Sequence, residues 1–199
     1  MTNVLLIGNG AREHAIAEAV MRSGRNPRIY SFMKTNNPGI VSLSEKVCIG
    51  RYDAPEAAVA FARDCGADFA IVGPEDPLSH GFVDALLTAG IPAVGPTRNL
   101  ARLETSKSFT RNLLDKYGIP GNPKFRNFTS VAGIEAFFAE LTGIVLKPDG
   151  LTGGKGVLVQ GDHFQTREEA LDHCSTILKS HPGVTVEEKL EGEEFSLQC

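Results

Sequence analysis

The sequence predicts an α/β fold, in which an N-terminal parallel sheet flanked by helices precedes a smaller α+β unit. Short runs rich in Val, Ile and Leu alternate with helix-like segments over the first half of the chain. This alternation is typical of parallel strands joined by crossover helices. In the second half a helix-length segment separates strands of mixed order, which favours an α+β arrangement.

The first half is expected to contain four strands and three helices. The strands are predicted at residues 4–7, 28–32, 69–72 and 93–94, and the helices at 11–22, 54–63 and 79–87. Strands of a parallel sheet are buried on both faces. The predicted core therefore consists of Val4, Leu6, Ile29, Phe69, Ile71, Val72 and Val94.

A helical pattern at 98–117 leads into the second half, and Pro120 and Pro123 then interrupt the chain. The expected elements after them are a strand at 124–126, a helix at 130–141, a strand–loop–strand unit at 144–159, a helix at 167–180 and a strand at 184–189. We place the domain boundary near residue 100, which gives domains of 1–100 and 101–199.

Composition predicts a cytoplasmic protein that binds neither nucleic acid nor membranes. The net charge is −4, no basic cluster is present, and no apolar run approaches the ~20 residues of a membrane span. The N-terminus has no basic segment before its short apolar run, so no signal peptide is expected. The four cysteines show no CxxC spacing, which indicates reduced thiols rather than zinc ligands or disulfides.

The most informative segment is the glycine-rich stretch between two β-branched runs at 144–159. Its four glycines allow the backbone N–H groups to approach a polyanion, and Lys147 and Lys155 supply positive charge. A Walker loop would need Ser or Thr after its lysine and then a helix, whereas Gly156 follows Lys155 and a strand comes next. We therefore predict a nucleotide-phosphate flap that is mobile without ligand.

The turn after the first strand, Gly-Asn-Gly-Ala-Arg-Glu at 8–13, resembles the start of a dinucleotide fingerprint. An NAD site is improbable because Glu13 replaces the third glycine and residues 27–34 contain no acidic side chain for the ribose. Two interpretations remain open. The glycines either form a tight strand-to-helix turn, or the helix N-terminus and Arg12 bind a substrate anion.

A second loop, Gly-Pro-Glu-Asp-Pro-Leu at 73–78, follows the strand at 69–72. Ligands of open α/β sheets bind beyond the carboxyl ends of the strands, so Glu75 is a candidate contact for a substrate amine or hydroxyl. A solvated turn with acidic residues at a helix start is an equal alternative. His80 is expected to be structural.

Together these blocks resemble the phosphoribosylamine–glycine ligases of the ATP-grasp superfamily. The resemblance is carried, in the family's order, by Gly-Asn-Gly-Ala-Arg-Glu-His-Ala at 8–15, the block at 73–78, Ser-Lys-Ser-Phe at 106–109, Lys-Pro-Asp-Gly-Leu-Thr-Gly-Gly-Lys-Gly-Val at 147–157 and Glu-Glu-Lys-Leu-Glu-Gly-Glu-Glu-Phe-Ser at 187–196. The family usually has glycine at the position of Ala11, and its members are roughly twice as long.

The resemblance implies a site for each substrate. It assigns ATP phosphates to Lys107, Lys147 and the flap, with Lys147 as the catalytic residue. The adenine hinge would use the backbone around Glu188 and Leu190, Glu187 near the exocyclic amine, and Glu194, or alternatively Glu193, at the ribose. The implied flap residues are Gly153, Gly154, Lys155 and Gly156, and those of the substrate cleft are Gly8, Gly10, Arg12, Glu13 and Glu75.

The implied domains are a substrate-cleft domain at 1–100 and a partial ATP-grasp domain at 101–199. The latter divides into linker helices at about 101–122, a subdomain at about 123–190 and a truncated part at 191–199. The stretch 194–199 reads as an interrupted strand, so the chain is expected to be a fragment or truncated product that is inactive alone.

The implied reaction belongs to purine biosynthesis. ATP phosphorylates the carboxylate of glycine, and the amine of 5-phosphoribosylamine attacks the acyl phosphate to give glycinamide ribonucleotide, ADP and phosphate. The ligands of Mg²⁺ or Mn²⁺ are expected beyond Cys199, with none in this chain. Two alternatives stay open: a carboxylase-like ATP-grasp component, and a non-catalytic nucleotide-binding module.

Overall fold

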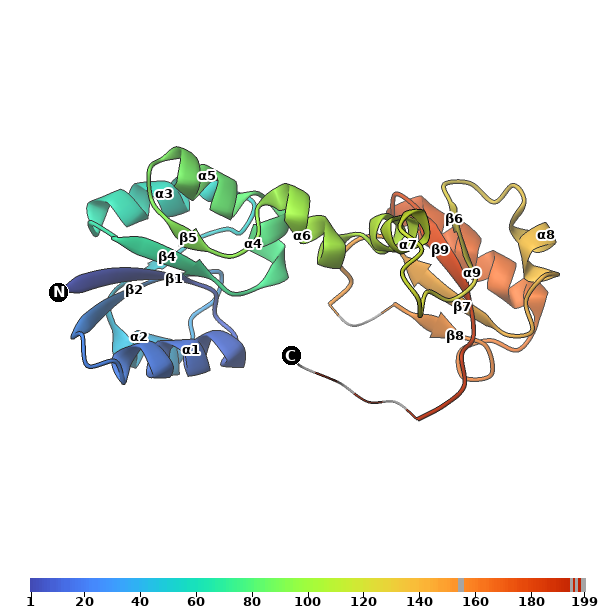
Figure 1. Ribbon diagram of the computed structural model, residues 1–199, viewed down its shortest axis with the longest axis horizontal. Helices are drawn as coiled ribbons and strands as arrows, with labels where there is room; N and C mark the ends of the chain where they lie inside the picture. The colour runs from blue at the N-terminus through green and yellow to red at the C-terminus, as the bar shows by residue number, and fades with distance from the viewer. Residues whose placement is uncertain (154–155, 194, 196, 198–199) are drawn as a thin grey trace. The chain divides into compact units, whose positions relative to one another are not determined.

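The computed structural model describes residues 1–153, 156–193, 195 and 197. The chain divides into two compact units, Met1–Arg102 and Leu103–Cys199. Each unit has its own sheet and its own hydrophobic core (Figure 1). No helix in the described ranges is both long enough and apolar enough to span a bilayer.

The first unit contains a five-stranded parallel sheet in the order β3-β2-β1-β4-β5. Central strand β1 pairs with β2 on one side and β4 on the other, so that Val4 lies opposite both Ile29 and Phe69. This confirms the predicted parallel sheet. The strands are β1 (Thr2–Ile7), β2 (Pro27–Met33), β3 (Ser44–Ile49), β4 (Phe69–Val72) and β5 (Ala93–Val94).

Helices cover both faces of this sheet, with α1 and α2 on one side and α3 and α5 on the other (Figure 1). Side chains alternate along β1, because Leu5 and Ile7 pack in the core of α3 and α5 while Leu6 packs in the core of α1 and α2. The helices are α1 (Ala11–Met21), α2 (Pro38–Leu43), α3 (Pro55–Asp64), α4 (Glu75–Ser79) and α5 (Phe82–Thr88).

Three details of the first unit differ from the expectation. The strand β3 and helix α2 were not predicted. The helix expected at 79–87 begins only at Phe82, as α5, since Gly81 before it adopts a left-handed conformation with φ 78°, and the short helix α4 that precedes it was not expected. Val94 is 60% exposed rather than buried, because β5 is a two-residue strand at the edge of the sheet. By contrast, Val4, Leu6, Ile29 and Val72 are buried as predicted, and Phe69 and Ile71 are partly buried.

The second unit contains a four-stranded antiparallel sheet in the order β6-β9-β7-β8. Leu146, Val184 and Val186 face the core that α8 and α9 form, so Lys147, Thr185 and Glu187 belong to the opposite face. The elements are α6 (Arg98–Thr105), which crosses the boundary, α7 (Lys107–Lys116), β6 (Phe125–Phe128), α8 (Ile134–Phe138), β7 (Ile144–Pro148), β8 (Leu158–Val159), α9 (Arg167–Ser180) and β9 (Val184–Glu188).

Local residues explain where these helices begin. Ser106 interrupts the helical pattern expected at 98–117, because its side chain accepts the Phe109 N–H and caps α7. Helix α8 is shorter than the predicted 130–141, since Gly133 with φ 83° precedes its first turn.

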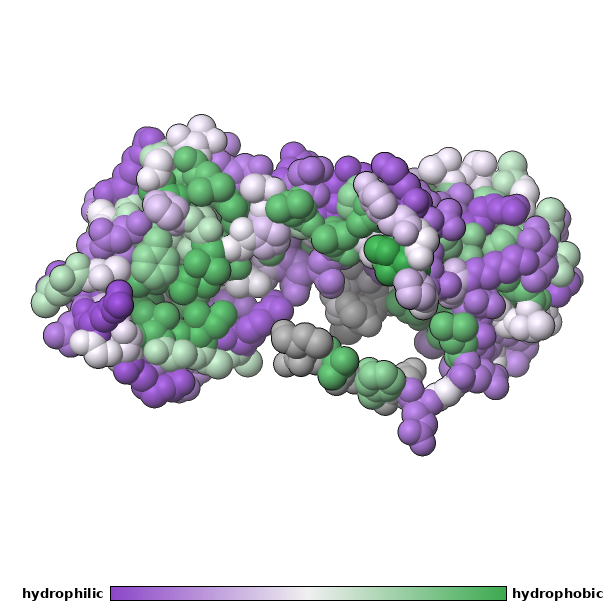
Figure 2. Space-filling view, viewed as in Figure 1, coloured by the Kyte–Doolittle hydropathy of each residue, from purple (hydrophilic) through white to green (hydrophobic). Residues whose placement is uncertain are grey.

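Helix α6 has hydrophobic residues on its surface, which appear as green atoms in Figure 2. Two of its leucines, Leu100 and Leu103, are more than half exposed.

The strand expected near the end of the chain is not seen at Phe195 and Leu197, which lie in no strand. Glu194 and the other members of that stretch lie outside the described residues, as do Gly154 and Lys155 of the predicted flap.

Candidate functional site

The carboxyl ends of β1 and β4 bring together three residues that the sequence predicted for a substrate cleft. Arg12 Nη2 lies 3.1 Å from Glu75 Oε1, and Arg12 Nε lies 3.1 Å from Glu13 Oε1. The parallel register places these loops side by side, because Ile7 and Val72, the last residues of the two strands, are paired. The guanidinium therefore links the two loops at the edge where open sheets bind ligands.

The Glu13 carboxylate is 3% exposed and supports the turn after β1. Its Oε2 accepts the N–H of Gly10 at 2.8 Å, which satisfies the backbone donor of the N-cap residue of α1. Glycines surround this side chain. A Cβ at Gly8 would lie 2.2 Å from Glu13 Cγ, and one at Gly73 would lie 2.4 Å from Oε1. The turn thus has the structural role that one interpretation gave it, while direct substrate contact by Glu13 stays a prediction.

A polar network fixes the neighbouring backbone, and its members were not singled out from the sequence. Tyr52 donates its hydroxyl to Asn9 Oδ1 at 2.7 Å, and Asn37 Nδ2 donates to the Asn9 backbone oxygen at 3.0 Å. Burial raises the pKa of Tyr52 to about 12. No short spacing reveals this pair, because Tyr52 is 43 positions from Asn9.

The same edge carries charge of both signs. Lys34 Nζ lies 3.4 Å from Asp76 Oδ2, beside the Arg12–Glu75 pair. The pKa of Glu75 is lowered, chiefly by a backbone hydrogen bond and then by Arg12, despite the opposing effect of burial. His80 bonds through its ring to Asp76 and Ser79 at the end of α4, which is the structural role expected of it.

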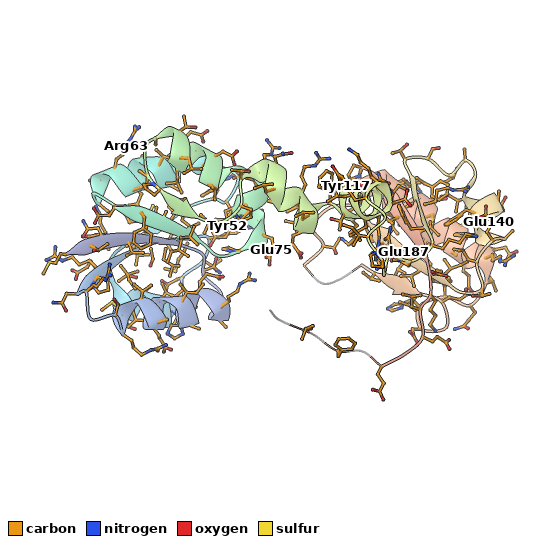
Figure 3. The ribbon with its side chains drawn as sticks, viewed as in Figure 1. Tyr52, Arg63, Glu75, Tyr117, Glu140 and Glu187 are labelled. Atoms are coloured by element: carbon orange, nitrogen blue, oxygen red, sulfur yellow. The ribbon has the colours of Figure 1, made fainter. Side chains whose placement is uncertain are left out.

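A second cluster, in the other unit, is built on the buried carboxylate of Glu187. Arg111 donates to both oxygens, from Nε to Oε1 at 2.6 Å and from Nη2 to Oε2 at 3.0 Å, and Lys147 Nζ lies 2.7 Å from Oε2 (Figure 3). The register of the sheet explains why Lys147 lies beside Glu187. Val145 pairs with Glu187 and Lys147 with Thr185, so Lys147 and Glu187 are diagonal neighbours on one face.

This cluster pairs two cations with one carboxylate. The Glu187 side chain is 3% exposed, and burial by itself raises the pKa of its carboxyl. Hydrogen bonds from Arg111 and Lys147 outweigh that effect, so the pKa lies below its ordinary value. Glu187 is therefore ionised at neutral pH, and its oxygens accept hydrogen bonds from Arg111 and Lys147, while its predicted place near the adenine amine stays a prediction.

The N-terminus of α7 is attached to the base of the glycine loop. Asp149 accepts hydrogen bonds from Ser108 N at 3.2 Å, Ser108 Oγ at 2.5 Å and Ser106 Oγ at 3.2 Å. Lys107 Nζ donates to the backbone oxygen of Gly150 at 2.8 Å. The segment that only the family resemblance had linked to phosphate binding is thus joined directly to the predicted flap.

The same contacts shift two pKa values. Burial lowers the pKa of Lys107, because it outweighs the opposing effect of the Asp149 carboxylate, and the charge of Lys147 adds to the lowering. Burial acts to raise the pKa of Asp149, but the hydrogen bonds from Ser108, Ser106 and Gly150 lower it below its ordinary value.

The remaining predicted nucleotide residues fall into three groups. Gly150, Gly153 and Gly156 have φ values of 102°, 60° and 103°, conformations that other residues rarely adopt. Glu188 is engaged with Lys124, whose N–H donates to its Oε1 at 2.7 Å, and the Leu190 side chain is 66% exposed. Gly154, Lys155 and Glu194 lie outside the described residues.

Two further observations concern a possible metal site and a surface pocket. In the part of the chain that the structure describes, no three His, Cys, Asp or Glu side chains form a group suited to a metal ion. A pocket of about 460 Å³ lies between the end of α7 and the start of β6, and none of the predicted nucleotide residues lines it. Its lining consists of Leu114, Asp115, Gly118, Ile119, Asn122, Pro123, Lys124 and Phe125.

Comparison with known proteins relates the chain to one enzyme family along its length. It is 44% identical over 197 residues to the phosphoribosylamine–glycine ligase of Methanococcoides burtonii, which covers 99% of this chain and 45% of that protein. It is 45% identical over 196 residues to the enzyme of the same name from Methanosarcina acetivorans, covering 98% and 44%. The chain thus spans about half the length of the curated relatives it matches.

Solved structures show the same fold. The phosphoribosylamine–glycine ligase of Thermotoga maritima gives a TM-score of 0.73 at 22% identity, over 96% of this chain and 45% of that one. The ADP complex of an N5-carboxyaminoimidazole ribonucleotide synthetase also gives 0.73, at 19% identity, over 95% and 47%. At such identities the likeness concerns the fold alone.

The family models decide the assignment. That of the phosphoribosylglycinamide synthetase N domain matches residues 2–104, and that of the ATP-grasp (A) domain of the same enzyme matches residues 105–199. The two models occur in sequence order and meet near the end of α6. The chain belongs to the phosphoribosylglycinamide synthetase family, the phosphoribosylamine–glycine ligases.

Proposed function

We propose that the native protein containing this chain ligates glycine to 5-phosphoribosylamine, with ATP converted to ADP and phosphate. The observation that carries the proposal is the pair of lysines at the base of the glycine loop. Lys107, the first residue of α7, donates to the backbone oxygen of Gly150, and Lys147 lies near the end of β7, the strand that leads into the loop. Two cations beside a glycine-rich backbone suit a polyphosphate.

The described residues fit a nucleotide phosphate chain. Lys107 donates to a neutral carbonyl, so no carboxylate neutralises its charge in that contact. Lys147 shares Glu187 with Arg111, which leaves the cluster positively charged. Glycines with positive φ on the loop allow the backbone to approach the phosphates closely.

The proposed chemistry needs two bond exchanges. The γ-phosphoryl group of ATP passes to the glycine carboxylate, and the amine of 5-phosphoribosylamine then attacks the acyl carbon. Phosphate leaves with the C–O bonding electrons, and the amine loses a proton. Protein catalysis of such steps consists mainly of positioning and charge stabilisation. We assign Lys147 to the charge that develops during phosphoryl transfer and Lys107 to phosphate binding.

Mg²⁺ or Mn²⁺ would neutralise phosphate charge in this reaction. The described residues offer no metal-binding group, so we assign none of them a metal-dependent step.

The strand-end cluster of the first unit is proposed to bind the ribosylamine substrate. The fork of donors on Arg12 suits its phosphate, the Gly8–Gly10 backbone lies at a helix N-terminus, and Glu75 suits an amine or hydroxyl. Support comes from their shared position at the carboxyl edge of the parallel sheet. We also propose a cytoplasmic location, which the free thiols of Cys48, Cys65 and Cys174 support.

The test is an assay of the native protein with ATP, glycine and 5-phosphoribosylamine generated in situ. We expect glycinamide ribonucleotide, with ADP and phosphate formed in equal amounts and only when all three substrates are present. Turnover with bicarbonate instead of glycine would favour the carboxylase-like alternative. ATP binding without turnover on any carboxyl substrate would favour the non-catalytic module.

A further inference from the structure

We propose that Arg111 is a positioning residue, which occupies the Glu187 carboxylate so that Lys147 can bind a nucleotide phosphate. The inference rests on the proposed function. Neither the glycine loop nor the blocks of family resemblance include Arg111. It lies on α7 at the i+4 position from Lys107, and residues at this spacing share one helix face.

The geometry gives Arg111 the larger share of the carboxylate. Its guanidinium makes two hydrogen bonds, one to each oxygen of Glu187, whereas Lys147 makes one. A forked pair of this kind is more directional than a single ammonium contact. Consequently, the Glu187 carboxylate keeps a cationic partner when the Lys147 ammonium turns toward a ligand.

A second contact fixes Arg111 independently of the nucleotide. Arg111 Nη1 donates to Asn122 Oδ1 at 3.2 Å, and Asn122 Nδ2 donates back to the Arg111 backbone oxygen at 3.2 Å. The guanidinium is therefore attached both to the segment between α7 and β6 and to β9. Its position does not depend on Lys147.

Charge decides the consequence of losing Arg111. Without it, Lys147 would be the remaining ion-pair partner of a carboxylate that is 3% exposed. A buried carboxylate strongly resists losing its last cation, because an unpaired buried charge is very unfavourable. Lys147 would then be retained by Glu187, and its charge would no longer be available to phosphate.

The experiment measures ATP affinity by calorimetry on the native protein, without glycine or ribosylamine, so that no turnover occurs. We expect Arg111→Gln to weaken ATP binding by about tenfold, a typical size for losing one charge-assisted contact. Adding Glu187→Gln should restore most of this loss, because the neutral amide no longer retains Lys147. Steady-state kinetics should show a higher KM for ATP and an unchanged KM for glycine.

Two controls separate this role from a purely structural one. Arg126→Gln removes an arginine whose pair with Glu140, at 3.5 Å, is solvent-exposed, and it should leave ATP affinity unchanged. Thermal unfolding of each variant shows whether it is folded at the assay temperature. If Arg111→Gln unfolds, Arg111→Met, which also removes the charge but keeps the aliphatic stem, provides the same comparison with and without Glu187→Gln.

Wild-type affinity in Arg111→Gln, or failure of Glu187→Gln to restore affinity in that background, would overturn the inference alone. Absence of ATP binding by the unsubstituted protein would overturn the proposed function and the inference with it.

Discussion

Lys107 Nζ donates a hydrogen bond to the backbone oxygen of Gly150 at 2.8 Å, which links the first residue of helix α7 to the start of the glycine loop. Asp149 reinforces this link from the loop side through its bonds to Ser106 and Ser108. The start of the loop is therefore attached to the N-terminus of α7 by side chains from both segments. A phosphate that replaces Gly150 as the partner of Lys107 would act on the loop directly.

Asp149→Asn tests this attachment through stability. We expect the variant to lose about 1–2 kcal/mol of unfolding free energy at pH 7, because the amide cannot accept all the hydrogen bonds that the carboxylate accepts. The pKa of Asp149 is lowered from 3.8, so its contribution is present above pH 3.8 and is lost as the pH falls through the lower, folded-state value.

The difference in unfolding free energy between Asp149→Asn and the wild type should therefore become smaller below pH 3.8. Urea unfolding at pH 7 and at pH 3 measures it, with the exposed Asp162→Asn as a control that changes little at either pH. A gap that stays constant over this range would contradict the assigned role.

Gly73→Ala tests the close packing around Glu13. The new Cβ would lie 2.4 Å from Glu13 Oε1, so we expect a loss of about 1–3 kcal/mol through overpacking. Gly24→Ala is the matched control, since its Cβ would meet nothing within 4 Å. Chemical denaturation measures both. In a Glu13→Ala background the Gly73 substitution should cost much less, and strictly additive effects would argue against contact between the two sites.

Arg12→Lys tests the strand-end cluster as the ribosylamine site. Lysine keeps the charge but loses the fork that reaches Glu13 and Glu75, so the KM for 5-phosphoribosylamine should rise by about tenfold. The affinity for ATP should not change. Arg22→Lys, at the exposed end of the same helix, is the control. If Arg12→Lys raised the KM for ATP as much as the KM for 5-phosphoribosylamine, the assignment of the two substrates to separate sites would be contradicted.

The sequence predicted the sheet of the first unit well where apolar runs are long and buried. The edge strand β3 was missed because its sequence, Ser-Glu-Lys-Val-Cys-Ile, has charged residues where a central strand would be apolar. The break between α4 and α5 depends on one left-handed glycine, Gly81, inside an otherwise helical pattern. A lone glycine is tolerated inside a helical pattern, so apolar periodicity does not reveal the break.

The site was predicted in part. Lys147 could be selected from the strand–loop–strand pattern, whereas Lys107 was found through the family resemblance alone. Arg111 and Tyr52 were missed because their partners are 76 and 43 positions away. The i,i+4 spacing of Lys107 and Arg111 on α7 was the available signal for the former. Nothing local marks Tyr52, since its role depends on the sheet bringing β1 and the segment after β3 together.

Calorimetric titration of ATP into Lys147→Met tests most directly the assignment of a phosphate site to the end of β7. Charge-assisted contacts to phosphate contribute roughly 1.5–3 kcal/mol, so affinity should fall about ten- to a hundredfold relative to the unsubstituted native protein. Lys179→Met, in the exposed last turn of α9, should bind ATP normally. Turnover should fall further than affinity, because the same charge stabilises the transition state. Unchanged ATP affinity and turnover in Lys147→Met would contradict the assignment.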